Sequence, residues 1–294
     1  MMENKKLDEN QIKGLENEYA LYACAFVDND ETAINLLTKY IMKHRREGQS
    51  DIDDIIIYFL SDIISLLDSC KLLIKEGRIT TVAILVRTLL EVMFQVLFLM
   101  DGNDAKENMK KVACYNVFSL CKLYNFLYLE KRSRKLTPEE NTLYLRLKHE
   151  HDDAKDSYVR EKIKKMDDSL KKHYINYWYT LHDEKIKNIS GLAKYLGGEI
   201  LYDAIYNSLS RFVHGEEGWR NIIKEKNTLA IRPFKNFSSS FSVLKMINDI
   251  VGRVLNKGQV VYSVNNIYTP NFREQQKNIY EKIKEIDGKV YRTR

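Results

Sequence analysis

The sequence predicts an all-α protein, a multi-helix bundle from which a long charged helical hairpin projects. Three observations predict this class. The 294 residues include only 3 prolines and 12 glycines, too few for the many tight turns of a sheet-rich fold. Apolar residues recur at helical spacing along most of the chain. Hydrophobic residues make up 44% of the composition, which is enough to bury a sizeable core.

Helical patterns fill the first half of the chain almost without a break. The third helix is the clearest, because Ile55, Phe59, Ile63 and Leu67 lie on one face and Gly77 is placed to terminate it. The apolar helix that follows ends near Asp101 and Gly102. The helices expected here are about Leu7–Val27, Glu31–Arg46, Asp51–Glu76, Ile79–Met100 and Asp104–Lys135.

The second half opens with a helix start at Thr137, an N-cap threonine followed by Pro138 and two acids. The charged residues from there to about Met166 predict the exposed arm of a hairpin, and the aromatic run Tyr174–Leu181 is expected to pack back on the body. A short strand is possible at Thr228–Arg232. Further helices are expected at Ile189–Leu196, Glu199–Val213, Phe241–Leu255 and Phe272–Ile286.

No low-complexity linker or internal repeat divides the chain. We expect three parts, which are N-terminal helices over 1–50, a helical core over 51–256, and a C-terminal loop with a basic helix over 257–294. The core is expected to include the hairpin at about 104–180.

Charge and cysteine usage indicate a cytoplasmic protein. The 47 basic and 41 acidic residues describe a mixed, solvated surface, which permits nucleic-acid binding without arguing for it. The start of the chain lacks the apolar core of a signal peptide. No CxxC pair occurs, so the cysteines are expected to be buried, reduced thiols: Cys24, Cys70, Cys114 and Cys121.

The most apolar helix carries the first candidate site. Arg87, Glu91 and Gln95 lie four residues apart and form one stripe, on the same side as Ile84, Phe94 and Phe98. Ionisable residues at the middle of a membrane span are costly, so we reject a membrane helix. Since the stripe is expected to face protein, it is either an intrahelical ion pair or a functional site.

The helix from Glu199 carries a second polar stripe, which contains Asp203, Asn207, Arg211 and His214. His214 follows the helix C-terminus, where the dipole favours an imidazolium that can titrate near neutral pH. Taken alone, this stripe is better explained as the solvated face of an amphipathic helix. The expected core face consists of Leu201, Ala204, Ile205, Ser208, Leu209 and Phe212.

Metal and cofactor sites are not indicated. His149, His151, Asp152 and Asp153 resemble metal ligands, but residues two apart on a helix point to different sides, so no metal is assigned. His182 and Asp183 lack a positioned nucleophile. There is no glycine-rich phosphate loop or dinucleotide fingerprint, and no cofactor is expected.

Three motifs together resemble a bacterial family of domains of unknown function, family 5677. They are EGRITTVAILVRTLLEVMFQVLFLM from Glu76, Trp178 followed by ISGLAKYLG, and YDAIYNSLSRFVHG, which ends at Gly215. The resemblance spans about Asp51 to Gly218. It implies an all-helical domain in which Arg87, Glu91 and His214 approach one another, but it supplies no activity.

A more distant resemblance is to the HEPN group of helical ribonuclease and toxin domains. That group implies metal-independent RNA cleavage at a site shared across a homodimer. Its enzymes place four to six residues between an arginine and a histidine of one helix, whereas Arg211 and His214 have only two between them, and Phe212 follows the arginine. Arg87 is then the natural candidate for the catalytic arginine.

The best functional hypothesis is an RNA-cleaving or nucleotide-handling effector of bacterial stress or phage defence. His214 would be the general acid and base, Arg87 or Arg211 would stabilise phosphorane charge, and Glu91 would orient Arg87. Expected substrate contacts are Gln95, Asn207, Ser210 and Trp178. The alternatives are a non-enzymatic module that binds a protein through the hairpin, and a small-molecule or nucleotide sensor. Expected partners are a second copy of the chain and RNA or a nucleotide, without a membrane.

Overall fold

The computed structural model of the chain describes residues 9–102, 104–153, 157–166, 176–213, 222–225, 228–231, 240–264, 267 and 270–291. Their contacts define two compact units, each assembled from separate segments. Unit 1 consists of Met1–His44, Ile57–Met100 and Ile200–Arg294, and unit 2 consists of Arg45–Ile56 and Asp101–Glu199. The expected all-α class is confirmed, while the three-part division of the chain stays a prediction.

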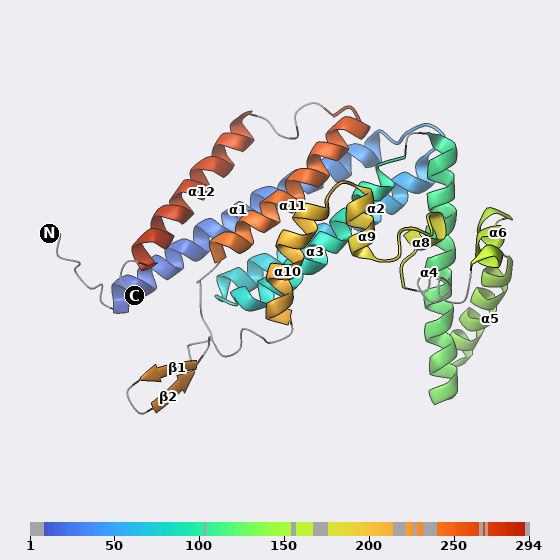
Figure 1. Cartoon of the computed structure of the whole chain (residues 1–294), viewed down its shortest axis with the longest axis horizontal. Helices are drawn as coiled ribbons and strands as arrows, with labels where there is room; N and C mark the ends of the chain where they lie inside the picture. Colours follow the sequence, from blue (N-terminus) through green and yellow to red (C-terminus); the bar gives the residue numbers. More distant parts are fainter. Residues whose placement is uncertain are drawn as a thin grey trace. The chain divides into compact units, whose positions relative to one another are not determined.

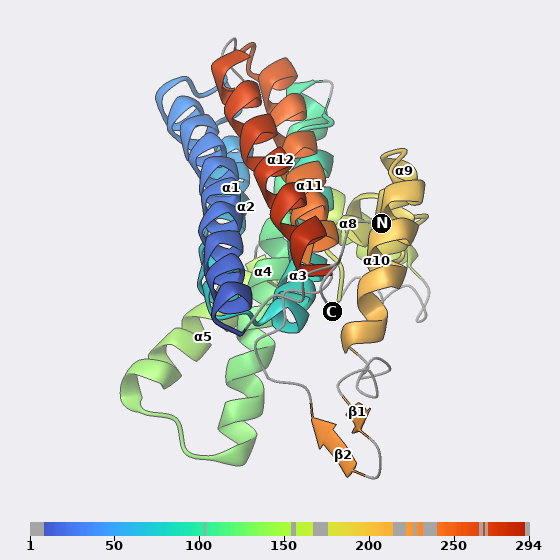
Figure 2. The same ribbon diagram turned by 90° about the vertical axis from the view of Figure 1, so that its left-hand side faces the viewer.

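Unit 1 is a bundle of long helices (Figure 1). Helix α1 packs along both α11 and α12, and α11 also packs along α3. Figure 2 shows the same neighbours from a second direction. The helices that contribute to this unit are α1 (Glu9–Lys43), the greater part of α2 (Ser50–Lys75), α3 (Ile79–Leu99), α10 (Glu199–Val213), α11 (Ser240–Val261) and α12 (Pro270–Tyr291).

The turn between α2 and α3 forms as the sequence predicted. Gly77 has φ +67°, a left-handed conformation that glycine adopts without steric cost. The amide of Arg78 donates to the carbonyl of Leu73 at 2.8 Å, and the amide of Gly77 donates to that of Ile74 at 2.9 Å. These two bonds satisfy the last carbonyls of α2 in a Schellman motif.

Helix α3 is the core helix of unit 1. Among the described helices, it alone has the length and hydropathy of a membrane span, and 61% of its most apolar window is buried. That degree of burial is consistent with a soluble protein, in which neighbouring helices cover the apolar face.

Helix α1 corrects one expectation, because it runs unbroken where two helices were predicted. The break was expected in the polar run Asp28–Glu31, but the side chains of this run bond to other helices. Lys71 of α2 pairs with Asp28 at 2.9 Å and with Glu31 at 2.6 Å. Gln276 of α12 donates to buried Asp30 at 3.0 Å. The polar residues therefore serve tertiary hydrogen bonds and ion pairs within one continuous helix.

Helix α11 continues past the residue where it was expected to end. Gly258 lies inside it, and a Cβ atom there would come within 2.7 Å of Cδ2 of Leu37 on α1. This glycine permits close approach of two helices and does not terminate one.

Unit 2 is built on a helical hairpin, in which α4 (Ala105–Ser133) pairs with α5 (Pro138–Asp153) (Figure 1). Leu127, Tyr144 and Leu147 form its apolar centre. The predicted start of α5 is confirmed, because Thr137 and Glu140 each accept a hydrogen bond from the other's amide, at 3.2 and 2.8 Å. That the hairpin projects stays a prediction.

Shorter elements complete the described residues. Helices α6 (Ser157–Lys165) and α8 (Tyr179–His182) pack on α4, and α9 (Ile189–Tyr195) follows. The strand expected near Thr228 is present as β2 (Thr228–Ile231), paired antiparallel with β1 (Ile222–Glu225), which the sequence analysis missed. The four cysteines are free thiols; three are buried, whereas Cys24 is only half-buried.

Candidate functional site

A guanidinium and two tyrosines meet where α10 lies against α3. The guanidinium carbon of Arg87 lies 4.1 Å from the ring centre of Tyr206, and its Nη2 also donates a hydrogen bond to the Tyr206 hydroxyl. On its other side, Nε is 3.6 Å from Oε1 of Glu91, one turn along the same helix. Two groups from different helices therefore fix the direction of one cation.

The second tyrosine extends this contact along α10. The rings of Tyr202 and Tyr206 stack with centres 4.6 Å apart, and Tyr202 also contacts Phe94 at 6.3 Å. Burial raises the pKa of the Tyr202 hydroxyl, and the neighbouring Tyr206 raises it further. Tyr202 therefore serves as a neutral aromatic surface at physiological pH.

Burial also governs the carboxyl group of this cluster. It raises the pKa of Glu91 although the positive charge of Arg87 opposes the shift. The Arg87 side chain keeps 22% of its surface exposed, so it remains reachable from solvent. An oriented, partly exposed guanidinium can bind an anionic oxygen without prior rearrangement.

The structure brings together only some of the residues expected at this site. Gln95 donates from its side chain to the backbone carbonyl of Glu91 at 3.4 Å, and Asn207 is exposed beside Tyr206. Ser210 and Arg211 lie on the last turns of α10, but their side chains are not described, and His214 lies outside the described residues. Its approach to Arg87 stays a prediction.

Two expectations about faces are wrong in part. Ile84 was expected to face protein beside Arg87, but it is 39% exposed, whereas Phe94 and Phe98 are buried. On α10, Ala204 and Ser208 are exposed rather than in the core. The buried face of α10 contains Tyr202, Ile205 and Leu209.

Unit 2 contains a second ionisable cluster that the sequence analysis missed. Nε2 of His182 is hydrogen-bonded to Oε1 of Glu107, which lies 75 positions away in the sequence. Lys110 also pairs with Glu107, at 3.1 Å, and Lys111 is buried nearby. His182 preceded by an aromatic run was visible in the sequence, but nothing local indicated its carboxylate partner.

The charges in this cluster act in opposite directions. Burial lowers the pKa of His182, and the charge of Lys111 lowers it further, against the attraction of Glu107. For Glu107, burial raises the pKa, but the bond from Lys110 and the interactions with His182 outweigh it and the net pKa is lowered. The geometry therefore describes a neutral imidazole that donates to a carboxylate.

Trp178 belongs to unit 2 and is only 1% exposed. Its ring contacts those of Tyr115 and Tyr179 edge-on, at 5.6 and 6.0 Å. This position makes it part of the aromatic core on which α8 and α4 pack.

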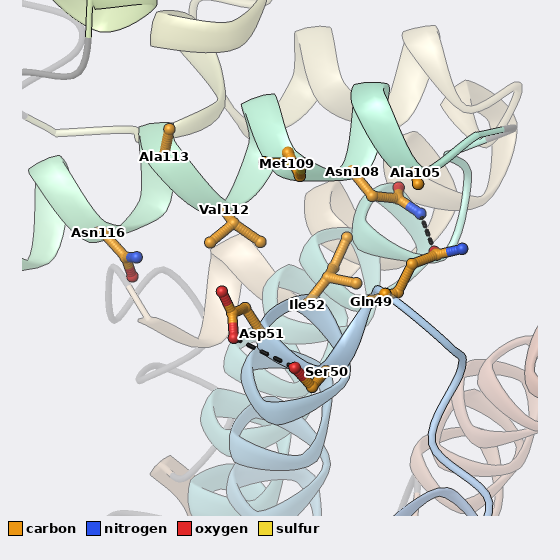
Figure 3. Close-up of a pocket in the computed structure, with 11 residues that line it drawn as sticks. Gln49, Ser50, Asp51, Ile52, Ala105, Asn108, Met109, Val112, Ala113 and Asn116 are labelled. Carbon is orange, nitrogen blue, oxygen red and sulfur yellow. Dashed lines mark hydrogen bonds between the residues drawn. The ribbon is translucent and has the colours of Figure 1, made fainter.

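A groove of about 380 Å³ lies between the first turn of α2 and one face of α4 (Figure 3). All its lining residues belong to unit 2. Asn108 crosses one end of the groove, where its Nδ2 donates to Oε1 of Gln49 at 2.6 Å. The other polar lining side chains are Ser50, Asp51 and Asn116.

Metal ligands do not gather in the described part of the chain. There, no group of three or more histidine, cysteine, aspartate and glutamate side chains is placed to hold a metal ion. His149 is exposed on α5, while the side chains of His151, Asp152 and Asp153 are not among those described.

Comparison with known proteins places the chain in a family without assigning an activity. Residues 53–228 match the family of unknown function DUF5677, and the chain belongs to that family. The match contains both the Arg87–Tyr206 contact and most of the residues that line the groove. No curated protein and no solved structure matches the chain.

Proposed function

We propose that this protein is a HEPN-like effector that cleaves RNA without a metal ion, or handles nucleotides, with Arg87 as its phosphate-binding group. The observation that supports this most is the oriented guanidinium, which Tyr206 and Glu91 hold while part of it faces solvent. Phosphoryl-transfer chemistry needs a fixed cation of this kind to stabilise the charge that develops on phosphate oxygens.

The proposed reaction uses the 2′-hydroxyl of RNA as nucleophile. It attacks the adjacent phosphorus, and the bond to the 5′-oxygen of the next nucleotide breaks, leaving a 2′,3′-cyclic phosphate. His214, the residue directly after α10, would accept the proton of the 2′-hydroxyl and return a proton to the leaving oxygen. Arg211 and Ser210 of the same helix would contact the phosphate. We place the protein in the bacterial cytoplasm as a homodimer.

The test is RNA cleavage by the purified protein in the presence of a metal chelator. We expect single-stranded RNA to be cut to products with cyclic phosphate ends. His214→Ala is expected to abolish cleavage, and Arg87→Lys, which keeps the charge but loses the planar contact with Tyr206, to slow it about 100-fold.

Arg253→Lys is the matched control, because Arg253 is an exposed arginine of another helix in unit 1 and is expected to have no effect. RNA that stays intact, or is cut equally well by the His214 variant, would contradict the proposal.

A protein-interaction module is the second candidate, and the hairpin of unit 2 favours it. Phe126 is 57% exposed there, and Leu129 and Leu145 are exposed as well. Exposed apolar side chains on one hairpin suit a protein partner. Under this candidate the purified protein cleaves no RNA, and Phe126→Glu should abolish the cellular function while leaving the helical circular-dichroism signal unchanged. A Phe126→Glu protein that keeps its cellular function would reject this assignment.

A further inference from the structure

The groove of unit 2 has polar groups of one restricted kind. Its polar side chains are amides, a hydroxyl and a carboxylate, and they belong to Gln49, Asn108, Asn116, Ser50 and Asp51. Among the described residues, no cationic side chain lines the groove. A phosphate or carboxylate ligand would therefore meet the negative charge of Asp51 without a compensating cation. The groove is suited to a neutral ligand that donates hydrogen bonds.

The side chains of the groove face one another from two helices. In Figure 3, Asp51 at the start of α2 and Asn116 on α4 point toward the same space, with Val112 between them. Ile52 and Met109 provide apolar walls, and Ala105 and Ala113 leave room along α4. A flat ring fits between such walls while its edge contacts the polar groups.

One lining side chain has an unfilled bonding capacity. Asn108 is only 2% exposed, and although its Nδ2 is bonded to Gln49, its buried Oδ1 has no hydrogen-bond partner among the described residues. That oxygen lies against Gly102, where an added Cβ atom would come within 1.6 Å of it, so Asn108 closes the end of the groove and the ligand contacts must come from Asp51 and Asn116.

Asp51 and Asn116 face the same space, and together they discriminate among planar ligands. A carboxylate accepts hydrogen bonds and donates none, whereas an amide does both. Guanine carries two adjacent donors, its N1–H and its 2-amino group, which match the two oxygens of a carboxylate. Its O6 can accept from the amide. Adenine and cytosine offer a single amino group on that edge, and uracil a single N–H.

We propose that this groove binds a guanine base, with Asp51 accepting from N1–H and the 2-amino group and Asn116 donating to O6. Ile52, Val112 and Met109 contact the ring. The site goes beyond the proposed function, because neither Arg87 nor His214 takes part in it. Guanine could come from a free nucleotide or from RNA, and the chemistry of recognition is the same for both.

Isothermal titration of the full-length protein with guanosine tests the proposal. We expect binding, and at least about tenfold weaker binding of inosine, which lacks only the 2-amino group. Uridine should bind more weakly still. Asp51→Asn, which keeps the shape but removes the charge, is expected to weaken guanosine binding about tenfold or more.

Asp54→Asn is the matched control. Asp54 lies in the same helix turn and pairs with Arg45 at 2.7 Å, but it does not line the groove, so its variant should bind guanosine normally. Asn116→Leu changes an exposed residue and gives a second variant that should fold and lose affinity. Equal binding of guanosine and inosine, unchanged affinity in both groove variants, or no binding of guanosine would overturn the proposal.

Two further titrations separate the sources of the base. Since no cation lines the groove, guanosine monophosphate should bind no more tightly than guanosine. If a guanine-containing single-stranded RNA binds more tightly than guanosine, RNA is the source of the base. If the two bind with equal affinity, the source is a free nucleotide. Arg87→Lys should leave guanosine affinity unchanged. Loss of RNA cleavage and loss of guanine binding are therefore separate results.

Discussion

Asp30 is a buried carboxyl group in unit 1 that links folding stability to pH. Its side chain is fully buried, and Nε2 of Gln276 donates to its Oδ1 at 3.0 Å. Burial raises its pKa well above the usual value, although the bond from Gln276 opposes this. Since the folded pKa exceeds the unfolded one, its contribution to stability is largest at acid pH and declines as pH rises.

Asp30→Asn is therefore expected to stabilise the protein at pH 8, by about 1–3 kcal/mol, because the amide needs no proton and still accepts from Gln276. The gain should shrink toward pH 4. Urea denaturation at several pH values measures it. Asp249→Asn, at an exposed site on α11, should change little at any pH. A less stable Asp30→Asn protein at pH 8 would contradict the assignment.

His182 and Glu107 have the opposite effect on stability. Both have lowered pKa values in the fold, His182 chiefly through burial. Their contribution is present near neutral pH and is lost as pH falls, from about 6.5 downward for the histidine and from about 4.5 for the glutamate. His182→Gln, which still donates to Glu107, should reduce the loss between pH 7 and 5 by about 1 kcal/mol.

His44→Gln is the control for this experiment, since His44 is exposed in unit 1. Thermal unfolding followed at pH 5, 6 and 7 provides the comparison. If the loss of stability between pH 7 and pH 5 is the same in His182→Gln and in the original protein, another group must titrate.

Sequence could predict local residue pairs and could not predict distant ones. Arg87 and Glu91 are one helical turn apart, so helix geometry alone places them together. Tyr206 lies 119 positions from Arg87 in the sequence, and its contact depends on how α10 packs. The pair of tyrosines at 202 and 206 was a visible signal, but the smaller apolar residues beside them suggested a different buried face.

At the scale of elements, helix starts and ends were predictable where their residues act locally. The Thr137–Glu140 capping box and the turn at Gly77 need only neighbours in sequence. The breaks expected after Val27 and near Gly258 were wrong, because those residues serve contacts with other helices. A polar run or a glycine has the same appearance in both situations.

Two glycines in helices should respond oppositely to alanine. In Gly258→Ala, the new methyl group would meet Leu37 at 2.7 Å, and we expect a loss of about 1–2 kcal/mol despite better helix propensity. Gly14 is exposed on α1 with nothing within 4 Å of the Cβ position, so Gly14→Ala should gain up to about 1 kcal/mol. Guanidinium denaturation of both variants tests this; equal effects would refute the close approach.

At the scale of the whole molecule, the family match and the compact units have different boundaries. The match covers 53–228 and so leaves out α1, α11 and α12, although α11 covers α3. The sequence did not predict the two units, because each is assembled from separated segments and no change of composition marks where one gives way to the other. Contacts between distant helices, rather than linkers, define them.

A fragment limited to residues 53–228 is therefore expected to aggregate. It would expose the apolar face of α3 that α11 buries in the full chain. Size-exclusion chromatography and binding of a hydrophobic dye compare the fragment with the full-length protein. A monodisperse fragment with a cooperative thermal transition would show that α1, α11 and α12 are dispensable for folding.

The enclosed indole of Trp178 gives unit 2 its own optical signal. The chain has one other tryptophan, Trp219, so replacing that residue with phenylalanine leaves a single emitting indole. Its emission should lie at short wavelength while the tyrosines around it exclude water, and move to longer wavelength when they separate. Fluorescence then follows unit 2 while circular dichroism follows all helices, and a difference between the two melting curves would measure how independently the units unfold.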